Sequence, residues 1–418
     1  MRNKFKQQSI TYHQPPPTLT RHLPRIQGRI QLISLTLMLL LLNACTAQDP
    51  ATATQPVTVP TLISADIPET EWDTIELIAQ AEQLSAPSFV NIGEETVFSW
   101  TGSQGTEARH FSRNVDGNTQ IMALSAYFPQ QQQLFPIDRG SLMVWLDRTH
   151  TEFDLRLQVG TFSDTGVALV GPVAISNQRT RNYSAIELDE RQIRLVWSGG
   201  LGEVTNLYLH QVDHFGRPVS GDLLRIDADY PALLRDNLGA IHLFWLEDNG
   251  RSAYHAQFDE IGDPTLTNIR RITGANISGT DTITHFNVGF DGTQAYLFWN
   301  IRRINDSQLV LMSYGQLADE RFSLPVPLFT TENQAVQWLN PAQAIQNPLP
   351  VVANSGNDLL LLWMQDGAVT ETEFIAESGE LIGLPNIMVS GDNLAVSWAQ
   401  PTSFGYANLF YSSRRHNP

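Results

Sequence analysis

The feature that most constrains this chain is a strand pattern that carries a tryptophan and recurs at intervals averaging about 50 residues. Residues 241–262 show it most clearly, because Ile241, Leu243 and Trp245 share one face of an extended segment and the alternate residues are also largely apolar. A strand that is apolar on both faces is typical of one buried on both sides. The tryptophans at positions 100, 145, 197, 245, 299, 363 and 398 are 45, 52, 48, 54, 64 and 35 residues apart. Four-stranded propeller blades repeat at roughly 40–50 residues, so the pattern predicts an all-β, seven-bladed β-propeller, with six or eight blades as alternatives.

The two ends of the repeat region predict how such a ring closes. Residues 73–78 have a strand pattern but no blade of their own, whereas the last blade, around Trp398, has only three strands. We expect the N-terminal strand to supply the missing fourth strand and so to remove an exposed sheet edge. The longest interval contains residues 330–350 with Trp338, which we interpret as an insertion in the loop before an inner strand. Loops of this kind often carry function.

The N-terminal segment has the pattern of a secretory signal. Residues 1–44 hold six basic residues and no acidic ones, and the apolar run 30–42 is short for a membrane-spanning helix. The sequence Leu42-Asn43-Ala44-Cys45 resembles the lipobox of bacterial lipoproteins, which implies cleavage between Ala44 and Cys45 and lipidation of Cys45. Cys45 is the only cysteine, which excludes internal disulfides. An ordinary signal peptide or an anchor helix is the alternative.

These patterns divide the chain into a lipoprotein signal peptide (1–44), a flexible tether rich in Thr, Ala and Pro (45–71) and a propeller (72–418). We expect the protein to lie outside the cytoplasm, at the cell surface or in the periplasm, anchored to a bacterial membrane by its lipid. After cleavage, 20 basic residues remain against 43 acidic ones, a net charge of −23. Such a charge disfavours nucleic acid as a partner.

Ligand sites in propellers lie on the face that carries the loops between second and third strands and the loops between successive blades. The first loop type contains or adjoins Arg148, His150, Glu203, Glu247, Asp248, Arg251, Arg302, Arg303 and Asp306. The second contains Arg179, Arg181, Tyr183, Asp227, Asp229, Tyr230 and Asp281. Arginines among carboxylates and tyrosines can bind acidic sugars or carboxylates in a bidentate manner, and they can equally be surface ion pairs. We expect the ligand-binding residues among Arg148, Arg179, Arg181, Tyr183, Asp229, Tyr230, Glu247, Arg251 and Arg302, together with Trp338 of the insertion.

The repeat resembles that of the sialidase-like propellers, whose diagnostic motif is Ser-x-Asp-x-Gly-x-x-Trp. The nearest segment, residues 390–398, lacks the glycine and has its tryptophan one residue late. No catalytic residue can therefore be carried over from that family, and we expect no sialidase activity. The sequence also contains no Asp-rich calcium loop, no phosphate-binding glycine loop and no Gly-x-Ser-x-Gly elbow, so we expect neither metal nor cofactor.

Two functional hypotheses remain. The first, which the missing catalytic motifs favour, is a non-enzymatic propeller that binds a protein or a glycan. The second is a glycan-active hydrolase or lyase that uses carboxylates on the loop face, for which two positioned carboxyl groups beside an aromatic platform would be the signature. A flat or filled central channel would favour the first hypothesis.

Overall fold

In the computed structural model, strands alternate with short turns from residue 72 onward. The structure describes residues 72–81, 83–84, 88–92, 95–104, 107–114, 119–122, 130–137, 140–148, 154–163, 168–189, 192–200, 204–259, 265–402 and 405–415. These belong to the second of the two units into which the chain divides, Ile67–Pro418. The predicted signal peptide, Ala44, Cys45, the tether, His150 and Glu203 lie outside the described residues.

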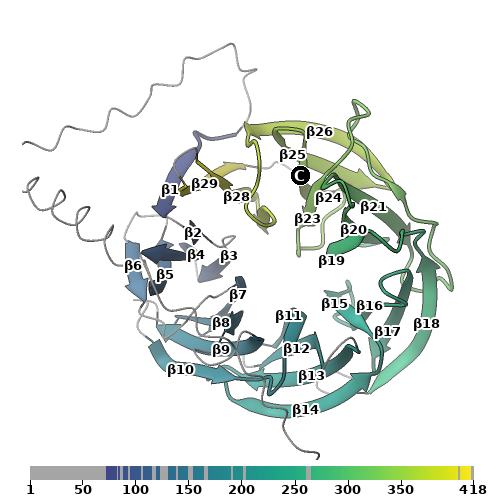
Figure 1. The fold of residues 1–418 in the computed structure, drawn as a ribbon, viewed down its shortest axis with the longest axis horizontal. Helices are drawn as coiled ribbons and strands as arrows, with labels where there is room; N and C mark the ends of the chain where they lie inside the picture. The colour runs from purple at the N-terminus through teal and green to yellow at the C-terminus, as the bar shows by residue number, and fades with distance from the viewer. Residues whose placement is uncertain are drawn as a thin grey trace, which may run out of the picture. The chain divides into compact units, whose positions relative to one another are not determined.

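The described strands form an all-β propeller, in which the sheets follow one another around a central opening (Figure 1). Six sheets have four antiparallel strands. Their strands, in chain order, are β7 (Gln130–Ile137), β8 (Gly140–Arg148), β9 (Leu155–Ser163), β10 (Ala168–Ala174); β11 (Thr180–Asp189), β12 (Gln192–Gly199), β13 (Asn206–Asp213), β14 (Pro218–Arg225); β15 (Asp229–Arg235), β16 (Ile241–Glu247), β17 (Ser252–Phe258), β18 (Leu266–Gly274); β19 (Thr282–Phe290), β20 (Ala295–Arg302), β21 (Gln308–Gly315), β22 (Val326–Pro327); β23 (Trp338–Pro341), β24 (Leu349–Ser355), β25 (Asp358–Gln365), β26 (Ala368–Glu377); and β27 (Asn386–Ser390), β28 (Asn393–Pro401), β29 (Ala407–Arg415) with β1 (Glu76–Ala81).

A further sheet is less regular. It contains β2 (Gln83–Leu84), β3 (Ser88–Ile92), β4 (Glu95–Gln104), β5 (Glu107–Asn114) and β6 (Thr119–Met122), and both β2 and β3 pair with β4. The structure therefore has six regular four-stranded blades, the number of the first alternative. A five-stranded sheet stands in the place of the remaining predicted blade.

The N-terminal strand closes the ring as the sequence predicts, three residues later than expected. Strand β1 pairs with β29, with Glu76 opposite Tyr411 and Ala81 opposite Ala407. Upstream of it, the Asp73 amide donates to the carbonyl of Ser413 at 2.8 Å. The two ends of the domain are thus joined by main-chain hydrogen bonds, which leave no unpaired edge on β29.

The interpretation of residues 330–350 as a loop insertion is wrong. Trp338 begins β23, the inner strand of its sheet, and Trp363 lies on β25, the third strand, whereas the other repeat tryptophans of regular blades lie on second strands. This blade carries its tryptophan on the third strand instead of the second. The interval from Trp299 to Trp363 is therefore long, and the interval from Trp363 to Trp398 is short. The second strand here is β24, whose seven residues are all buried.

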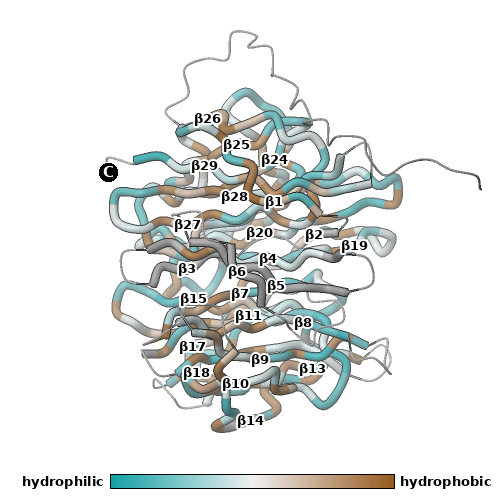
Figure 2. The backbone as a smooth tube through the Cα atoms, turned by 90° about the vertical axis from the view of Figure 1, so that its left-hand side faces the viewer, coloured by the Kyte–Doolittle hydropathy of each residue, from teal (hydrophilic) through white to brown (hydrophobic). Residues whose placement is uncertain are grey.

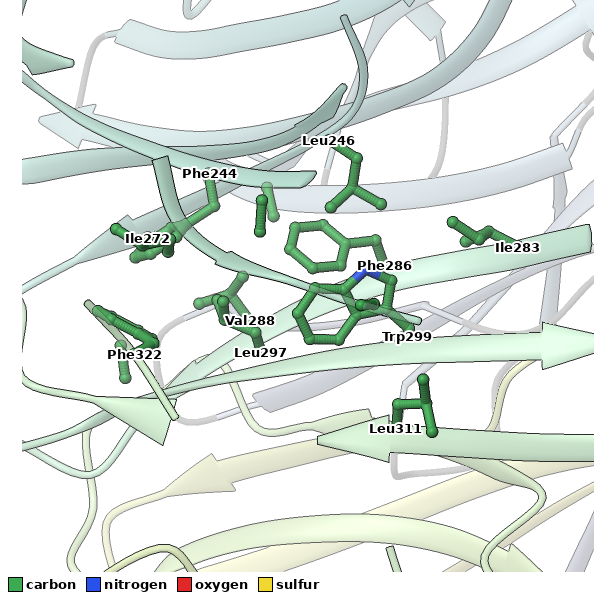
Figure 3. Close-up of a cluster of buried hydrophobic side chains, with 14 of the residues drawn as sticks. Phe244, Leu246, Ile272, Ile283, Phe286, Val288, Leu297, Trp299, Leu311 and Phe322 are labelled. Carbon is green, nitrogen blue, oxygen red and sulfur yellow. The ribbon is translucent and has the colours of Figure 1, made fainter. Parts of the chain in front are cut away.

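The core lies between adjacent sheets, where second strands that are apolar on both faces pack against both neighbours. Figure 3 shows one such cluster, in which Phe244 and Leu246 of β16 approach Phe286 of β19 and Trp299 of β20. Trp145, Trp245 and Trp299 have no exposed surface. Seen from the side, the hydrophilic colour concentrates in turns at the strand ends (Figure 2).

One turn shows why the sequence needs glycine. In the turn after β16, Asp248, Asn249 and Gly250 all have positive φ, and a Cβ atom on Gly250 would lie 1.9 Å from the Cδ1 atom of Ile283. Only glycine therefore fits this position, where the turn packs against the next blade. Among the described residues, no helix is long and apolar enough to cross a membrane.

Candidate functional site: the central cavity

The inner strands surround a cavity of about 760 Å³. This volume falls within the roughly 300–1,000 Å³ of small-molecule sites. Among the described residues that line it there is no Asp, Glu, Lys or Arg. The polar lining is dominated by neutral amides: Gln130, Gln131, Gln132, Gln133, Asn287, Asn340, Gln343 and Asn386. The cavity wall therefore combines apolar side chains with neutral polar ones, and its described part carries no Asp, Glu, Lys or Arg.

Strand register places several of these lining residues at one level. In six sheets, one inner-strand residue pairs with the residue that directly precedes the repeat tryptophan: Ser88, Gln133, Ser184, Ala232, Asn287 and Asn386. Asn340 of β23 pairs with Val352 of β24, which takes the second-strand place in its blade. We call this set the polar belt, which is interrupted only at Ala232.

Hydrogen bonds between adjacent sheets confirm that the polar belt lies at a single level. The Ser88 hydroxyl accepts from the amide of Leu134 at 3.1 Å, and the Ser184 hydroxyl accepts from the amide of Leu233 at 3.0 Å. Leu134 and Leu233 each follow the belt position of the next sheet. The belt side chains therefore join one inner strand to the next, and each such bond contributes about 1 kcal/mol to stability.

Three of the four belt amides use their nitrogens in the same way, whereas the Oδ1 atom of the fourth, Asn386, accepts from the amide of Ile387 at 2.9 Å. The side-chain NH₂ groups of Gln133, Asn287 and Asn340 donate to the carbonyls of Ala185 (3.3 Å), Leu339 (3.1 Å) and Pro385 (3.0 Å). These contacts fix which end of each amide is nitrogen. The side-chain oxygens of Gln133, Asn287 and Asn340 accept no hydrogen bond from any described residue, and they are not among the buried unsatisfied atoms. Each of the three oxygens is thus an accessible acceptor.

His285 contributes the one imidazole of the described lining. It lies on β19, two residues before Asn287, and its ring meets the edge of Trp338 at a centroid distance of 5.8 Å. Burial lowers the pKa of His285 to about 4, so the ring is neutral at pH 7. Its Nδ1 atom is buried and has no partner among the described residues. The neutral ring carries one N–H donor and one acceptor nitrogen.

The sequence-predicted residues gather instead at the ends of the strands. Arg181 lies 3.7 Å from Asp229, and the Asp229 carboxylate also accepts from the Ser198 hydroxyl (2.5 Å) and the Asn182 side-chain amide (3.0 Å). Tyr230 follows with positive φ, and its amide donates to the same carboxylate. This carboxylate is occupied by four local partners, which suits a structural role in joining two sheets.

The two predicted tyrosines are held by backbone carbonyls. The Tyr183 hydroxyl donates to the carbonyls of Gln131 and Val144, and the Tyr230 hydroxyl donates to that of Ile283 at 2.7 Å. Burial raises the pKa of both phenols, and the Asp229 carboxylate adds to the effect at Tyr230. Both phenols therefore remain protonated donors and are poor general bases. Of the ten predicted ligand-binding residues, Tyr183 alone lines the cavity within the described wall.

The other predicted residues have separate places. The Glu247 carboxylate accepts from Trp245 Nε1 (2.9 Å) and from Arg225 (3.1 Å), and Arg251 Nε donates to the Ile277 carbonyl at 3.2 Å. Arg179 is exposed and lies 3.8 Å from Asp154, while Arg148 and Arg302 end β8 and β20. Trp338 is half-buried beside His285. The structure thus brings together Arg181, Asp229 and Tyr230, and it places Trp338 against His285 but not in the described cavity lining.

Sequence reasoning missed the polar belt and His285. The sequence does contain a signal for the polar belt. Each belt residue except Ala232 and Asn340 is a polar residue that directly precedes an apolar or small residue within an inner strand. It becomes visible only when the inner strands are aligned through their pairing with the tryptophan strands.

Comparison with known proteins establishes the fold. No protein-family model matches the chain, and no curated protein matches it. Among solved structures, the polysaccharide lyase Uly1 aligns at a TM-score of 0.55 with 7% identity, over 79% of this chain and 90% of that one. A polysaccharide lyase described as PL25-Ulvanlyase, bound to a GlcA(1-4)Rha3S chain, aligns at 0.52 with 12% identity, over 77% and 90%. The likeness at this identity shows a shared propeller fold.

Proposed function

We propose that this protein is a glycan-binding propeller whose glycan site is the central cavity. The observation that carries the proposal is the polar belt, because it presents fixed, uncharged hydrogen-bonding groups around an open cavity large enough for a sugar. Amide groups suit sugar hydroxyls, since each side can donate and accept. His285 adds an aromatic ring to this wall, and Trp338 contacts that ring.

Binding is the core of the proposal, because the described wall lacks the groups that glycan hydrolysis and β-elimination need. Glycoside hydrolysis commonly requires two carboxyl groups beside the scissile bond, and the described lining contains none. β-Elimination acts on uronates, whose carboxyl group makes the neighbouring ring proton acidic, and the described lining has no arginine or lysine to bind that carboxyl group.

We also propose the cellular setting and the completed ring. The lipobox-like sequence supports lipidation at Cys45, with the tether 45–71 holding the propeller outside the cytoplasm. We count the five-stranded sheet as a seventh blade, because β4 carries Trp100 and because Ser88 of β3 contributes to the polar belt.

Isothermal titration against a panel of neutral and acidic oligosaccharides tests the glycan site. We expect at least one of them to bind, and we expect Gln343→Ala to weaken that binding at least five-fold. The Gln343 side chain lines the cavity and makes no hydrogen bond with a described residue, so its removal leaves the fold intact. Gln316→Ala, on an exposed turn, is the matched control. A panel without any binder, or equal affinities for both variants, would contradict the proposal.

A further inference from the structure

We infer that the cavity selects uncharged, hydroxyl-rich glycan chains and rejects acidic ones, and that the amides of the polar belt determine this preference. The inference rests on the proposed glycan function and names the chemical class of ligand. It concerns which hydrogen-bonding groups of a sugar have a complementary partner on the cavity wall.

The first argument is the direction of the belt hydrogen bonds. The nitrogens of Gln133, Asn287 and Asn340 are already engaged with main-chain carbonyls of the next sheet. Each NH₂ group uses one of its two N–H bonds in this way, so these residues offer a ligand their side-chain oxygens as fixed acceptors, beside at most one further N–H each. A sugar hydroxyl supplies the donor that such an oxygen needs, whereas a carboxylate or sulfate supplies only further acceptors.

The second argument is the absence of positive charge along the described wall. Recognition of a carboxylate or sulfate usually relies on arginine or lysine, and no described lining residue is either of these. His285 does not replace them near neutral pH, because burial keeps its pKa at about 4. An anionic group that leaves water for this cavity would lose its hydration without gaining a counter-charge.

Three further amides extend the match to a neutral sugar. The side chains of Gln130, Gln131 and Gln343 also line the cavity, and no hydrogen bond from them to a described residue is formed. Their amides can turn either end toward a ligand and can donate to ring and glycosidic oxygens. The wall thus combines fixed acceptors with adaptable donors, as a chain of neutral sugars requires.

The net charge of the whole chain acts in the same direction. The sequence carries 43 acidic residues against 26 basic ones. A negative protein field lowers the encounter rate with polyanions, and salt screens this effect. Long-range charge and the local wall therefore both disfavour acidic glycans, and only the long-range part depends on salt.

The test compares pairs of hexasaccharides that share linkage and stereochemistry but differ in the oxidation of C6. A β-1,4-linked mannan hexamer and its mannuronate counterpart form one pair, and a β-1,4-glucan hexamer and its glucuronate counterpart form another. Titration at 0.15 M and at 0.5 M salt separates local recognition from the long-range field. We expect the neutral member of the binding pair to bind at least ten-fold more tightly at both salt concentrations.

Two lysine variants test which residues set the preference. Gln133→Lys keeps a donor for the Ala185 carbonyl and adds a positive charge to the belt, so the preference for the neutral sugar should fall at least five-fold. Gln343→Lys adds the same charge where the original side chain makes no hydrogen bond with a described residue, and should act in the same direction even if position 133 tolerates no change. Gln133→Met controls for the loss of the amide without added charge.

The outcomes separate this inference from the proposed function. If the uronate member binds as tightly as the neutral one, or more tightly, the inferred selectivity is wrong while the glycan site stands. If both lysine variants keep the wild-type preference, the belt does not set it and the inference also fails. If no hexamer binds, the proposed glycan function itself is overturned.

Discussion

One largely buried ion pair links the last two blades in the chain, and its removal gives the sharpest stability prediction. Arg414 of β29 forms two contacts of 2.8 Å with the Glu373 carboxylate of β26, and its side chain is only 5% exposed. The same carboxylate accepts from Trp363 Nε1 at 2.5 Å. The Arg414 guanidinium lies over the ring of Trp72, with 5.3 Å between its Cζ atom and the ring centroid. This cluster therefore joins the N-terminal segment to the last two blades in the chain.

Glu373→Gln should lower the free energy of unfolding by about 3 kcal/mol. Loss of one partner of a buried pair costs roughly 3–5 kcal/mol, because the remaining charge stays buried without compensation. We take the lower end because the Glu373 side chain is 19% exposed. Gln can still accept from Trp363, so that hydrogen bond does not add to the loss.

Denaturant titration followed by tryptophan fluorescence measures this loss. Glu371→Gln is the matched control, since Glu371 lies on the same strand with its side chain exposed and should change stability by less than 0.5 kcal/mol. The double variant Glu373→Leu with Arg414→Met should recover most of the stability, because both buried charges are removed together. Equal losses for Glu373→Gln and Glu371→Gln would refute the reasoning.

Three further predictions address the core, the buried histidines and the anchor. Trp245→Ala should cost about 3–5 kcal/mol in the same titration, whereas Trp338→Ala should cost clearly less because Trp338 is half-buried; equal losses would contradict the packing described. Burial lowers the pKa of His255 to about 3 and that of His285 to about 4. As the pH falls below about 6.5, these histidines become protonated in the unfolded chain while they stay neutral in the folded one. The free energy of unfolding should therefore fall with the pH, by roughly 1.4 kcal/mol per pH unit for each histidine. His255→Gln should flatten this profile in acid titrations of stability, and an unchanged slope would count against it. Metabolic labelling with a fatty-acid analogue should tag the wild type and leave Cys45→Ser unlabelled, and equal labelling would exclude the lipid anchor.

The fold class could be predicted because its signal is local and repeated. Each tryptophan strand shows its two apolar faces within seven or eight residues, and the spacing then gives the size of the blade. Closure by the N-terminal strand followed from counting strands at both ends, and the pairing of β1 with β29 confirms it. The position of Trp363 could not be predicted, because a second and a third strand that are equally buried look alike in sequence.

The site was harder to predict, because it depends on lateral register between strands about 50 residues apart. Loop residues such as Arg181 and Asp229 attract attention by their charge, yet they mainly satisfy each other and their neighbours. Asn287 and Asn340 are unremarkable in sequence. They become a site only because pairing brings them to the same level of the cavity and engages their nitrogens.

The central claim is that a glycan binds in the cavity beside the polar belt. A crystal structure of the protein with the tightest-binding neutral hexasaccharide tests it most directly. The account predicts sugar density inside the cavity, with hydroxyls within hydrogen-bond distance of the side-chain oxygens of Gln133, Asn287 or Asn340. A sugar bound at the outer strands, with no sugar in the cavity, would contradict it.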